Sequence, residues 1–455
     1  MQVAGKNAVI VGAGASGLAA AELLVRQGAR VVVNDGRSRE ALGDTARRAE
    51  LAGAELALGG HDEAIFDGAD LVVVSPGVPP LPVFDALAAR GVEVIGEIEL
   101  ASRFLTGALI AIGGTNGKST VTTLVGEMMR KTGRPTFVGG NLGQPLAEAV
   151  GTPAGVEGGV SVVEVSSFQL ERVRRFAPDV AVLLNVTPDH LDRYPSFELY
   201  AEAKGNAFAA QRPGSHAVVP AGDALCLRLA RRSRGAVHTF GGADGEVRLI
   251  GGALTDTVTG FALPRAELPL AGRHNEDNAC AAILAARLAG AGEGAIREAL
   301  REARGLAHRA VIVRELEGVT YVDDSKATNV GATIAALDGL ATPERRAVLI
   351  AGGVDKGGSY APLAERLREV GRGVVLIGQA SALIASALEG LGLPMERAET
   401  MEEAVSRARR LAQRGDLVLL APACSSFDMF KSYAHRGDVF QEAVRALTAE
   451  EGAWA

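Results

Sequence analysis

The sequence ALIAIGGTNGKSTVTTLVGEMMRK, residues 108–131, predicts a strand, a glycine-rich turn and a helix in succession. Residues 108–112 are all apolar, which is typical of a buried strand. Apolar residues recur at helical spacing over 119–131, and GGTNGKST at 113–120 lies between the two patterns. Such a turn presents backbone N–H groups and the positive end of the helix dipole to an anion. The segment therefore predicts an α/β domain that binds nucleotide phosphates at this turn.

The side chains of this loop match that role. Lys118 can reach the β- and γ-phosphates, and the hydroxyl of Ser119 or Thr120 can present an oxygen to Mg²⁺. Residue 112 is Ile where the usual P-loop pattern has glycine, which points away from GTPases and motor ATPases. A glycine-rich turn with an incidental lysine is the alternative. We expect nucleotide contacts at Gly113, Gly114, Thr115, Asn116, Gly117, Lys118, Ser119 and Thr120.

A second glycine-rich turn lies near the N-terminus. Residues 12–17, GAGASG, follow a predicted strand at 7–11 and precede a predicted helix at 16–27, and Asp35 ends the next strand. This context is typical of dinucleotide-binding units, in which a diphosphate sits on the helix N-terminus. Any diphosphate satisfies the geometry, so the motif does not distinguish NAD from a UDP-sugar. A tight turn without a ligand and a solvated Asp35 stay open as alternatives.

Strand and helix patterns alternate along all 455 residues and predict an α/β protein of three domains. We expect a Rossmann-like N-terminal domain at 1–100, a central P-loop-type ATPase domain with a mainly parallel sheet at 101–304, and a C-terminal Rossmann-like domain at 305–455. The other predicted strands are 30–34, 71–75, 92–95, 159–165, 180–185, 311–316, 319–322, 347–351, 373–377 and 417–420, and the other predicted helices are 38–52 and 275–288.

Composition excludes several classes of protein. Hydrophobic residues make up 47% and charged residues 22%, which is globular rather than disordered composition. The net charge of −7 disfavours a nucleic-acid-binding surface. Cys226, Cys280 and Cys424 form no CxxC pair, which fits a reducing compartment better than a disulfide framework or a zinc ribbon. No apolar run is long enough for a membrane span, and we expect a soluble, cytoplasmic monomer.

Further polar residues follow the central strands. Glu164 ends the strand 159–165, and Asp189 and His190 follow the strand 180–185. Such strand ends face the crevice where α/β sheets bind ligands, which makes Glu164 and His190 candidate metal ligands. Taken alone, His190 is equally explained as a structural loop histidine, and Lys204 as a solvated lysine on a helix.

Eleven short motifs follow one another along the chain: GAGASG, SPGV at 75–78, GEIEL at 96–100, GGTNGKST, GGNLG at 139–143, EVSSFQL at 164–170, NVTPDHLDRY at 185–194, GRHNEDNA at 272–279, DDSKATN at 323–329, GGVDKG at 352–357 and APACSSFDMFKSYAHRG at 421–437. In these motifs and their order the chain resembles, over nearly its whole length, the ATP-dependent Mur ligases of peptidoglycan synthesis. Two motifs, DSKATN and PACSSFD, favour the branch that adds D-glutamate over those that add L-alanine, a diamino acid or a dipeptide.

The resemblance implies an ATP-dependent amide ligase. Such an enzyme would phosphorylate the carboxylate of UDP-N-acetylmuramoyl-L-alanine, and the D-glutamate amine would then attack the acyl phosphate. The implied contacts to the UDP-linked substrate are Ser16, Asp35, Arg37, Ser75, Asn141 and Gln169. The implied contacts to D-glutamate are Lys326, Thr328, Lys356, Ser426, Phe427 and Tyr433.

The resemblance also implies ATP and two Mg²⁺ ions as cofactors. Lys204 would be carbamylated, because an ammonium repels Mg²⁺ whereas a carbamate supplies anionic oxygens. The implied metal ligands are Ser119, Glu164, His190 and Lys204, and the implied ATP contacts outside the loop are Asn275, Asn278, Arg309 and Asp324. The residues implied to act in catalysis are Lys118, His190, Lys204 and Arg309.

Two alternatives remain. A ligase similar to folylpolyglutamate synthetase, or another Mur-type ligase, would share the ATP loop and the carbamylated lysine. The first of these would leave residues 1–100 without a purpose, and binding of a UDP-sugar distinguishes it. The other alternative belongs to a different class, a non-catalytic, nucleotide-responsive protein with a dinucleotide domain. It is excluded if ATP turnover requires an amino-acid acceptor.

Overall fold

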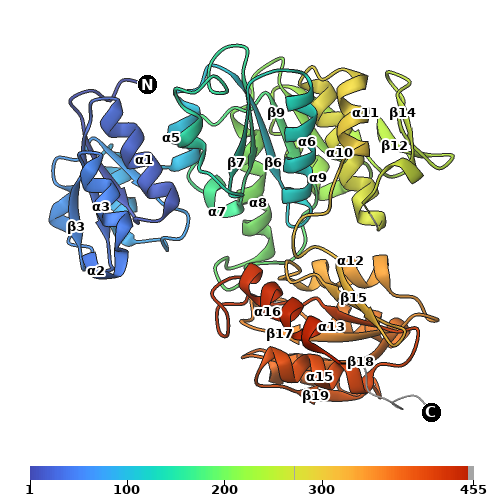
Figure 1. Cartoon of the computed structure of the whole chain (residues 1–455). Coiled ribbons are helices and arrows are strands. Elements are labelled where there is room, and N and C mark those ends of the chain that lie inside the picture. The colour runs from blue at the N-terminus through green and yellow to red at the C-terminus, as the bar shows by residue number, and fades with distance from the viewer. Residues whose placement is uncertain (271, 449–455) are drawn as a thin grey trace. The chain divides into compact units, whose positions relative to one another are not determined.

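The computed structural model describes residues 1–270 and 272–448, which divide into two compact units (Figure 1). The first unit comprises Met1–Val186, Ala201–Leu268 and Asp277–Glu302. The second comprises the described residues of Thr187–Tyr200, Pro269–Glu276 and Ala303–Ala455. Two sheets lie in the first unit and one in the second, and all three are mainly parallel, as the α/β prediction requires.

The N-terminal sheet has five parallel strands in the order β3-β2-β1-β4-β5. The chain runs outward from β1 to β3 and then returns to β4, which lies on the other side of β1. The connections that follow β1 and β4 therefore run in opposite directions, and the point between these two strands is a topological switch point. The strands are β1 (Asn7–Val11), β2 (Arg30–Asp35), β3 (Glu55–Leu58), β4 (Leu71–Val74) and β5 (Glu93–Gly96), and the helices are α1 (Ala15–Arg26), α2 (Arg39–Leu42), α3 (Asp44–Leu51), the 3₁₀ turn η1 (Glu63–Phe66), α4 (Pro82–Ala89) and α5 (Glu97–Ser102).

The central sheet has nine strands in the order β14-β13-β12-β11-β10-β9-β6-β8-β7, of which only the β12–β13–β14 end is antiparallel. Its strands are β6 (Ala108–Gly113), β7 (Thr136–Gly140), β8 (Val160–Glu164), β9 (Val180–Leu183), β10 (His216–Pro220), β11 (Ala236–Phe240), β12 (Val247–Ile250), β13 (Ala253–Asp256) and β14 (Ala262–Pro264). Its helices and turns are α6 (Lys118–Lys131), η2 (Leu146–Ala149), α7 (Ser167–Leu170), α8 (Phe197–Ala209), α9 (Ala224–Ala230), η3 (Arg265–Glu267), α10 (Arg273–Leu288) and α11 (Glu293–Arg301).

The sheet of the second unit has six strands in the order β15-β16-β20-β17-β18-β19, and only the β15–β16 pair is antiparallel. Its strands are β15 (Val311–Leu316), β16 (Val319–Asp323), β17 (Ala347–Gly352), β18 (Gly371–Ile377), β19 (Met395–Arg397) and β20 (Leu417–Leu420). Its helices are α12 (Val330–Leu340), α13 (Ala361–Val370), α14 (Ser381–Ala387), α15 (Met401–Leu411) and α16 (Tyr433–Ala446).

Both faces of this last sheet are buried at its centre, which explains why β17 and β20 are apolar throughout. Leu349 and Ala351 of β17 belong to one hydrophobic cluster, and Val348 and Ile350 belong to the other. Successive residues of a strand point to opposite faces, so an uninterrupted apolar run indicates helices on both sides.

The predicted strands and three of the four predicted helices are found within two residues of their predicted ends. The prediction of one helix over 38–52 is wrong. Gly43 adopts a φ of +52° and ends α2, and α3 begins at Asp44. The prediction also omitted β3, β7, β10 to β14 and β19. Within the described ranges, no helix is both long enough and apolar enough to cross a membrane.

Candidate active site

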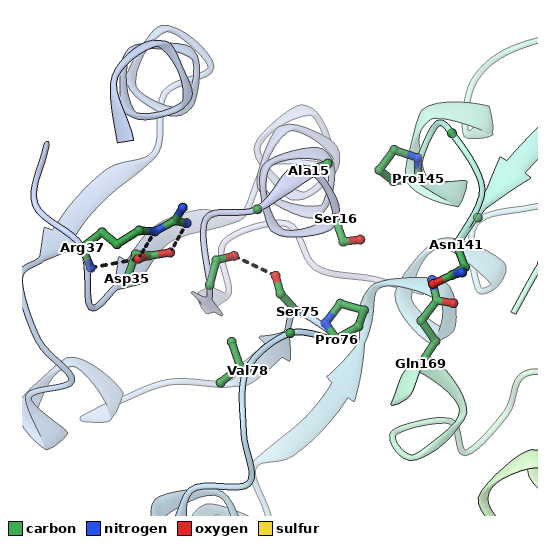
Figure 2. A pocket seen from close by; sticks show the side chains of 15 residues that line it. Ala15, Ser16, Asp35, Arg37, Ser75, Pro76, Val78, Asn141, Pro145 and Gln169 are labelled. Atoms are coloured by element: carbon green, nitrogen blue, oxygen red, sulfur yellow. Dashed lines mark hydrogen bonds and ion pairs between the residues drawn. The ribbon is translucent and has the colours of Figure 1, made fainter. Parts of the chain in front are cut away.

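A pocket of about 470 Å³ opens at the carboxyl ends of β1 and β4 (Figure 2). One wall comes from the turns that follow β1, β2 and β4, and the other from the loop after β7 and from α7. The lining residues are Gly12, Gly14, Ala15, Ser16, Asp35, Arg37, Ser75, Pro76, Gly77, Val78, Gly140, Asn141, Gly143, Pro145 and Gln169. All six residues expected to contact the UDP-linked substrate are therefore brought together here.

Close packing of α1 on β1 places a helix N-terminus in this pocket. A Cβ on Gly17 would lie 1.9 Å from the carbonyl oxygen of Gly12, so only glycine allows the helix to begin at this point. The first turn of α1 contains no acidic residue. Its unpaired N–H groups and dipole favour a negatively charged ligand beside Ala15 and Ser16.

Asp35 stabilises the first wall of the pocket through hydrogen bonds. Its carboxylate accepts hydrogen bonds from the N–H of Ala13 at 2.7 Å and from the guanidinium of Arg37 at 2.8 and 2.9 Å. The hydrogen bonds from Arg37 hold the pKa of Asp35 far below its ordinary value, against the opposing effect of burial. The side chain of Arg37 remains 54% exposed, so Asp35 fixes the loop while Arg37 faces the pocket.

Three further side chains of the pocket have defined partners. Ser75 Oγ donates to the carbonyl of Gly12 at 2.7 Å, which ties the turn after β4 to the turn after β1. Asn141 Nδ2 donates to Glu164 at 2.6 Å, and Gln169 Oε1 accepts from the N–H of Ser166 at 2.9 Å. Within the described chain, Gln169 Nε2 and Asn141 Oδ1 have no hydrogen-bond partner, which leaves a donor and an acceptor for a ligand.

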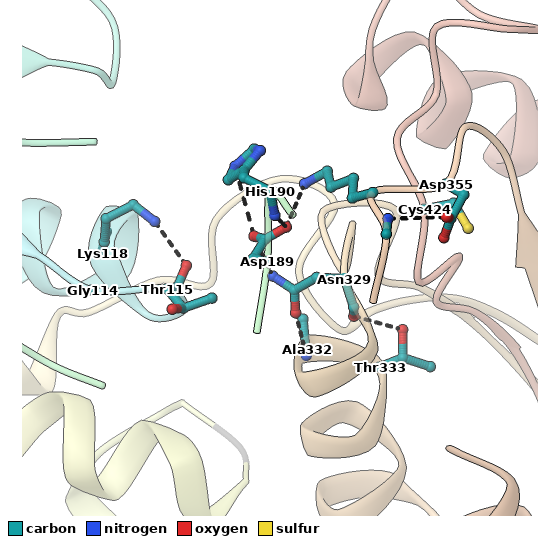
Figure 3. A network of polar contacts seen from close by, with 12 residues as sticks. Gly114, Thr115, Lys118, Asp189, His190, Asn329, Ala332, Thr333, Asp355 and Cys424 are labelled. Atoms are coloured by element: carbon teal, nitrogen blue, oxygen red, sulfur yellow. Dashed lines mark hydrogen bonds and ion pairs between the residues drawn. The ribbon is translucent and has the colours of Figure 1, made fainter. Parts of the chain in front are cut away.

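The loop after β6 has the geometry of a phosphate-binding turn. Gly117 has a φ of +84°, and a Cβ there would lie 2.4 Å from Asn278 Oδ1. The N–H groups of Thr115 and Asn116 bond to Asn185, so the loop is fixed against β9. Lys118 Nζ donates to the carbonyl of Thr115 at 2.8 Å (Figure 3). The glycine cradle, the N-terminus of α6 and a lysine fit the phosphates of ATP.

Two oxygen-bearing side chains meet beside this loop. Ser119 Oγ donates to Glu164 Oε2 at 2.7 Å, and both residues are buried. Hydroxyl and carboxylate oxygens are the donors that Mg²⁺ prefers, so the pair fits one Mg²⁺ ion. Among the described residues, no group of three or more His, Cys, Asp and Glu is placed to hold a metal.

Lys204 on α8 is buried rather than solvated. Its side chain is 2% exposed, and Nζ donates to the carbonyl of Gly114 at 2.8 Å. The residue therefore lies against the ATP loop.

The second unit contains a separate polar network (Figure 3). Asp189 is paired with Lys356 at 3.2 Å and accepts from Asn329 Nδ2 at 3.0 Å. Burial alone would raise the pKa of Asp189, but the charges of Lys356 and His190 and the hydrogen bond from Asn329 outweigh it, and the pKa is lowered. His190 has a φ of +56°, and its Nε2 lies 3.7 Å from Asp189 Oδ2.

The residues expected to bind D-glutamate gather at one edge of the sheet of the second unit. Parallel strands β16, β20 and β17 are neighbours, and the loops that follow them contain Thr328, Ser426 and Lys356. Val354 and Ser425 form a β-bridge, and the N–H of Ala423 bonds to the carbonyl of Ala327. The three loops are thus tied together. Ser426 is buried, whereas Phe427 is 74% exposed.

Most of the other expected residues also belong to the second unit. Lys326 Nζ lies 3.9 Å from the ring centroid of Tyr433, a cation–π contact. Burial raises the pKa of Asp324 to about 7, because it outweighs the opposing charge of Arg309. Arg309 also faces His274, whose pKa is lowered by burial and by this guanidinium. Of the two expected ATP contacts on α10, Asn275 belongs to the second unit and Asn278 to the first.

Sequence reasoning missed several buried ionisable residues. Arg436 is fully buried, where it donates to Ser325 and to the carbonyl of Cys424, and burial lowers its pKa to about 10. Glu97 and Glu99 are also buried. Their motifs, GEIEL and SYAHRG, contributed only to the family resemblance, since a charged side chain is by default assigned to solvent.

Comparisons with known proteins agree with this arrangement. Residues 6–96 match the N-terminal domain of MurD-like Mur ligases, residues 112–286 match the Mur ligase middle domain, and residues 308–424 match the Mur ligase glutamate ligase domain. The chain is similar in fold to a pseudomurein peptide ligase type C from Methanothermus fervidus, with a TM-score of 0.63 and 19% identity, over 97% of this chain and 100% of that one.

Sequence similarity to curated relatives is much closer. A UDP-N-acetylmuramoylalanine–D-glutamate ligase from Anaeromyxobacter dehalogenans is 47% identical, with 97% of each chain covered. A ligase of the same name from Geotalea daltonii is 44% identical over 98% of this chain and 99% of its own. With its three matching domains and this full-length similarity, the chain belongs to the Mur ligases, in the family of UDP-N-acetylmuramoylalanine–D-glutamate ligases.

Proposed function

We propose that this chain joins D-glutamate to UDP-N-acetylmuramoyl-L-alanine at the expense of ATP, in the cytoplasmic synthesis of peptidoglycan precursors. The observation that carries the proposal is the continuous contact from Asn141 through Glu164 to Ser119. Asn141 lines the N-terminal pocket, and Ser119 lies in the first turn of the helix α6 at the ATP loop. One buried carboxylate thus joins the two sites whose ligands must react.

The pocket suits the UDP end of the substrate. A diphosphate would sit at the N-terminus of α1, with Ser16 and Arg37 as donors, and Asn141 and Gln169 would contact the sugar side. The substrate carboxylate would extend toward Glu164. A redox dinucleotide is a weaker fit, because the second wall of the pocket comes from the central domain that holds the ATP loop.

The ATP loop suits phosphoryl transfer to that carboxylate. Two anions must approach each other, and Lys118 would place a positive charge on the transferring group. Mg²⁺ bound by Ser119 and Glu164 would neutralise part of the remaining negative charge. We assign a second Mg²⁺ ion to His190 and a carbamylated Lys204. We also assign to Arg309 the stabilisation of negative charge at the γ-phosphate.

D-glutamate would bind at the loop edge of the second unit, at Thr328, Lys356, Ser426 and Phe427. Its two carboxylates need cationic and hydrogen-bonding partners once water is excluded. Lys356 supplies the charge and Ser426 a hydroxyl, with Lys326 and Tyr433 beside them. Attack of the bound amine on the acyl phosphate would give the amide and inorganic phosphate.

Two measurements test the proposal against its rivals. ADP formation by the full chain should require both UDP-N-acetylmuramoyl-L-alanine and D-glutamate. Calorimetry should show that the UDP-linked substrate binds without ATP, whereas a folate substrate does not. ADP formation with neither acceptor would contradict the ligase assignment, and binding of folate in place of the UDP-sugar would favour the folylpolyglutamate-type alternative.

A further inference from the structure

The structure assigns Glu97 and Glu99 of α5 a role as positioning residues for the UDP-linked substrate. Neither glutamate lines the pocket. Each instead holds one of the two central-domain segments that form its second wall. The inference rests on the proposed function, since it concerns the same pocket and the same substrate.

Helix α5 follows directly from β5, the last strand of the N-terminal sheet, and packs against η2 of the central domain. In Figure 1 it lies between the N-terminal sheet and the central sheet. Both belong to one compact unit. The helix is therefore one of the elements that connect the first wall of the pocket to the second, together with α1, which also packs against η2.

Glu97 holds the first of the two segments. Its Oε1 accepts a hydrogen bond from the N–H of Ala147 at 2.6 Å. Ala147 lies in η2, two residues after Pro145, and η2 follows the loop whose residues Asn141, Gly143 and Pro145 line the pocket. A carboxylate bound to a backbone N–H fixes the chain rather than a side chain, so the bond sets the position of the loop itself.

Glu99 holds the second segment. Its carboxylate accepts from the N–H of Arg174 at 2.9 Å and from that of Arg175 at 3.0 Å. The N–H of Gly96, one residue before α5, bonds to the carbonyl of Arg172 at 3.2 Å. These residues follow α7, which contains Gln169 of the pocket. Figure 2 shows Asn141, Pro145 and Gln169 together on one side of the pocket.

The burial of these carboxylates is the second observation. Glu97 is 2% exposed and Glu99 is fully buried. Within the described chain, Glu97 Oε2 has no hydrogen-bond partner, and burial raises the pKa of Glu97 to about 7. A buried polar atom without a partner costs stability and calls for an explanation. We explain this cost by the bond that the other oxygen of Glu97 accepts from Ala147, because that bond fixes the position of the loop that contains Asn141.

Glu93 provides a matched control. Arg103 donates to Glu99 at 2.7 Å and to Glu93 at 2.7 and 2.8 Å, so the two glutamates share one guanidinium. Among the described residues, however, Glu93 bonds to no backbone group of the second wall. Its replacement removes a charge from the same cluster without releasing either pocket segment.

The test uses the full chain with Glu97→Met, Glu97→Gln, Glu99→Leu and the control Glu93→Gln. The Met and Leu variants lose the acceptor, and we expect the Kd and KM for UDP-N-acetylmuramoyl-L-alanine to rise about 10-fold, as expected for one lost charge-assisted hydrogen bond. The KM values for ATP and D-glutamate and the kcat should change little. Glu97→Gln keeps an acceptor oxygen and should bind the substrate as the wild type does, as should Glu93→Gln.

The results that would overturn the inference differ from the result that would contradict the proposed function. Unaltered Kd values in folded Glu97→Met and Glu99→Leu variants would overturn the inference, as would an equal increase of all three KM values, which indicates general loss of structure. If Glu97→Met does not fold, Glu97→Asp withdraws the oxygen by one methylene and must show the same selective increase. Failure of the wild type to bind the UDP-linked substrate would instead contradict the proposed function.

Discussion

The ammonium of Lys356 lies 3.2 Å from Oδ1 of Asp189, in a pair that is largely buried. Asn329 holds the other carboxylate oxygen at 3.0 Å. The lysine that we assign to a carboxylate of D-glutamate is therefore already paired with a carboxylate of its own unit. A bound D-glutamate must share Lys356 with Asp189 or take it over, so the affinity for the amino acid should depend on this ion pair.

Replacement of Lys356 by Gln should raise the KM for D-glutamate at least 10-fold, because a partly buried carboxylate of the ligand loses its cation. The KM for UDP-N-acetylmuramoyl-L-alanine should stay within about 2-fold of the wild type. Lys431→Gln is the matched control, since Lys431 is an exposed lysine of the same unit. An unaltered KM for D-glutamate in Lys356→Gln would remove the amino-acid site from this loop.

Lys118→Ala should lower kcat by on the order of 10²-fold or more, the size of one lost electrostatic stabiliser of the transition state. The control is Lys131→Ala on the same helix, whose side chain pairs with Glu298 and Glu302 instead. Steady-state kinetics with varied ATP distinguish the outcomes. A rise of the KM for ATP alone would mean that Lys118 binds ground state and transition state equally.

Lys204→Ala should be nearly inactive if the residue serves as a carbamate. The space that it leaves against Gly114 is buried, and small carboxylates such as formate or acetate should enter it and restore part of the activity. The measurement is the turnover rate at increasing carboxylate concentration, with wild type as the control. Full activity of the variant without any carboxylate would exclude a catalytic role.

Glu97 should make the protein less stable as the pH rises. Its pKa is about 7 in the folded chain against an ordinary value of 4.5. The folded state therefore holds the proton more tightly, and the stabilisation present below pH 4.5 is lost as the pH rises through 7. Glu97→Gln should gain up to about 3 kcal/mol relative to the wild type between about pH 5 and 8. Denaturant unfolding of both chains at each pH measures this difference, and a pH-independent difference would contradict the shift.

Much of the fold was predictable because both faces of its parallel sheets are buried. Runs such as residues 347–351 and 417–420 are apolar throughout and end at glycine or at small residues. Several of the omitted strands lack that signal. β7 ends in two glycines, and β12 to β14 form an exposed antiparallel end of the central sheet, with Leu249 and Ile250 more than 40% exposed. Their strand character comes from pairing with neighbours, which local pattern does not encode.

The candidate site was predictable where one loop carries the chemistry and less so where distant segments meet. GGTNGKST indicates its ligand by itself, and Glu164 at the end of β8 follows from its place in the sheet. The sequence does not indicate that the carboxylate of Asp35 accepts hydrogen bonds from Arg37, or that Lys356 forms an ion pair with Asp189. Those contacts depend on side-chain positions between segments that are far apart along the chain.

The most direct test of the account is acceptor specificity. Phosphate release from ATP is measured with UDP-N-acetylmuramoyl-L-alanine and, in turn, D-glutamate, L-glutamate, L-alanine and a diamino acid. The account predicts rapid release with D-glutamate, background release with the other three, and a UDP-linked product with one new amide bond. Equal turnover with L-alanine or the diamino acid, or no turnover with D-glutamate, would contradict it.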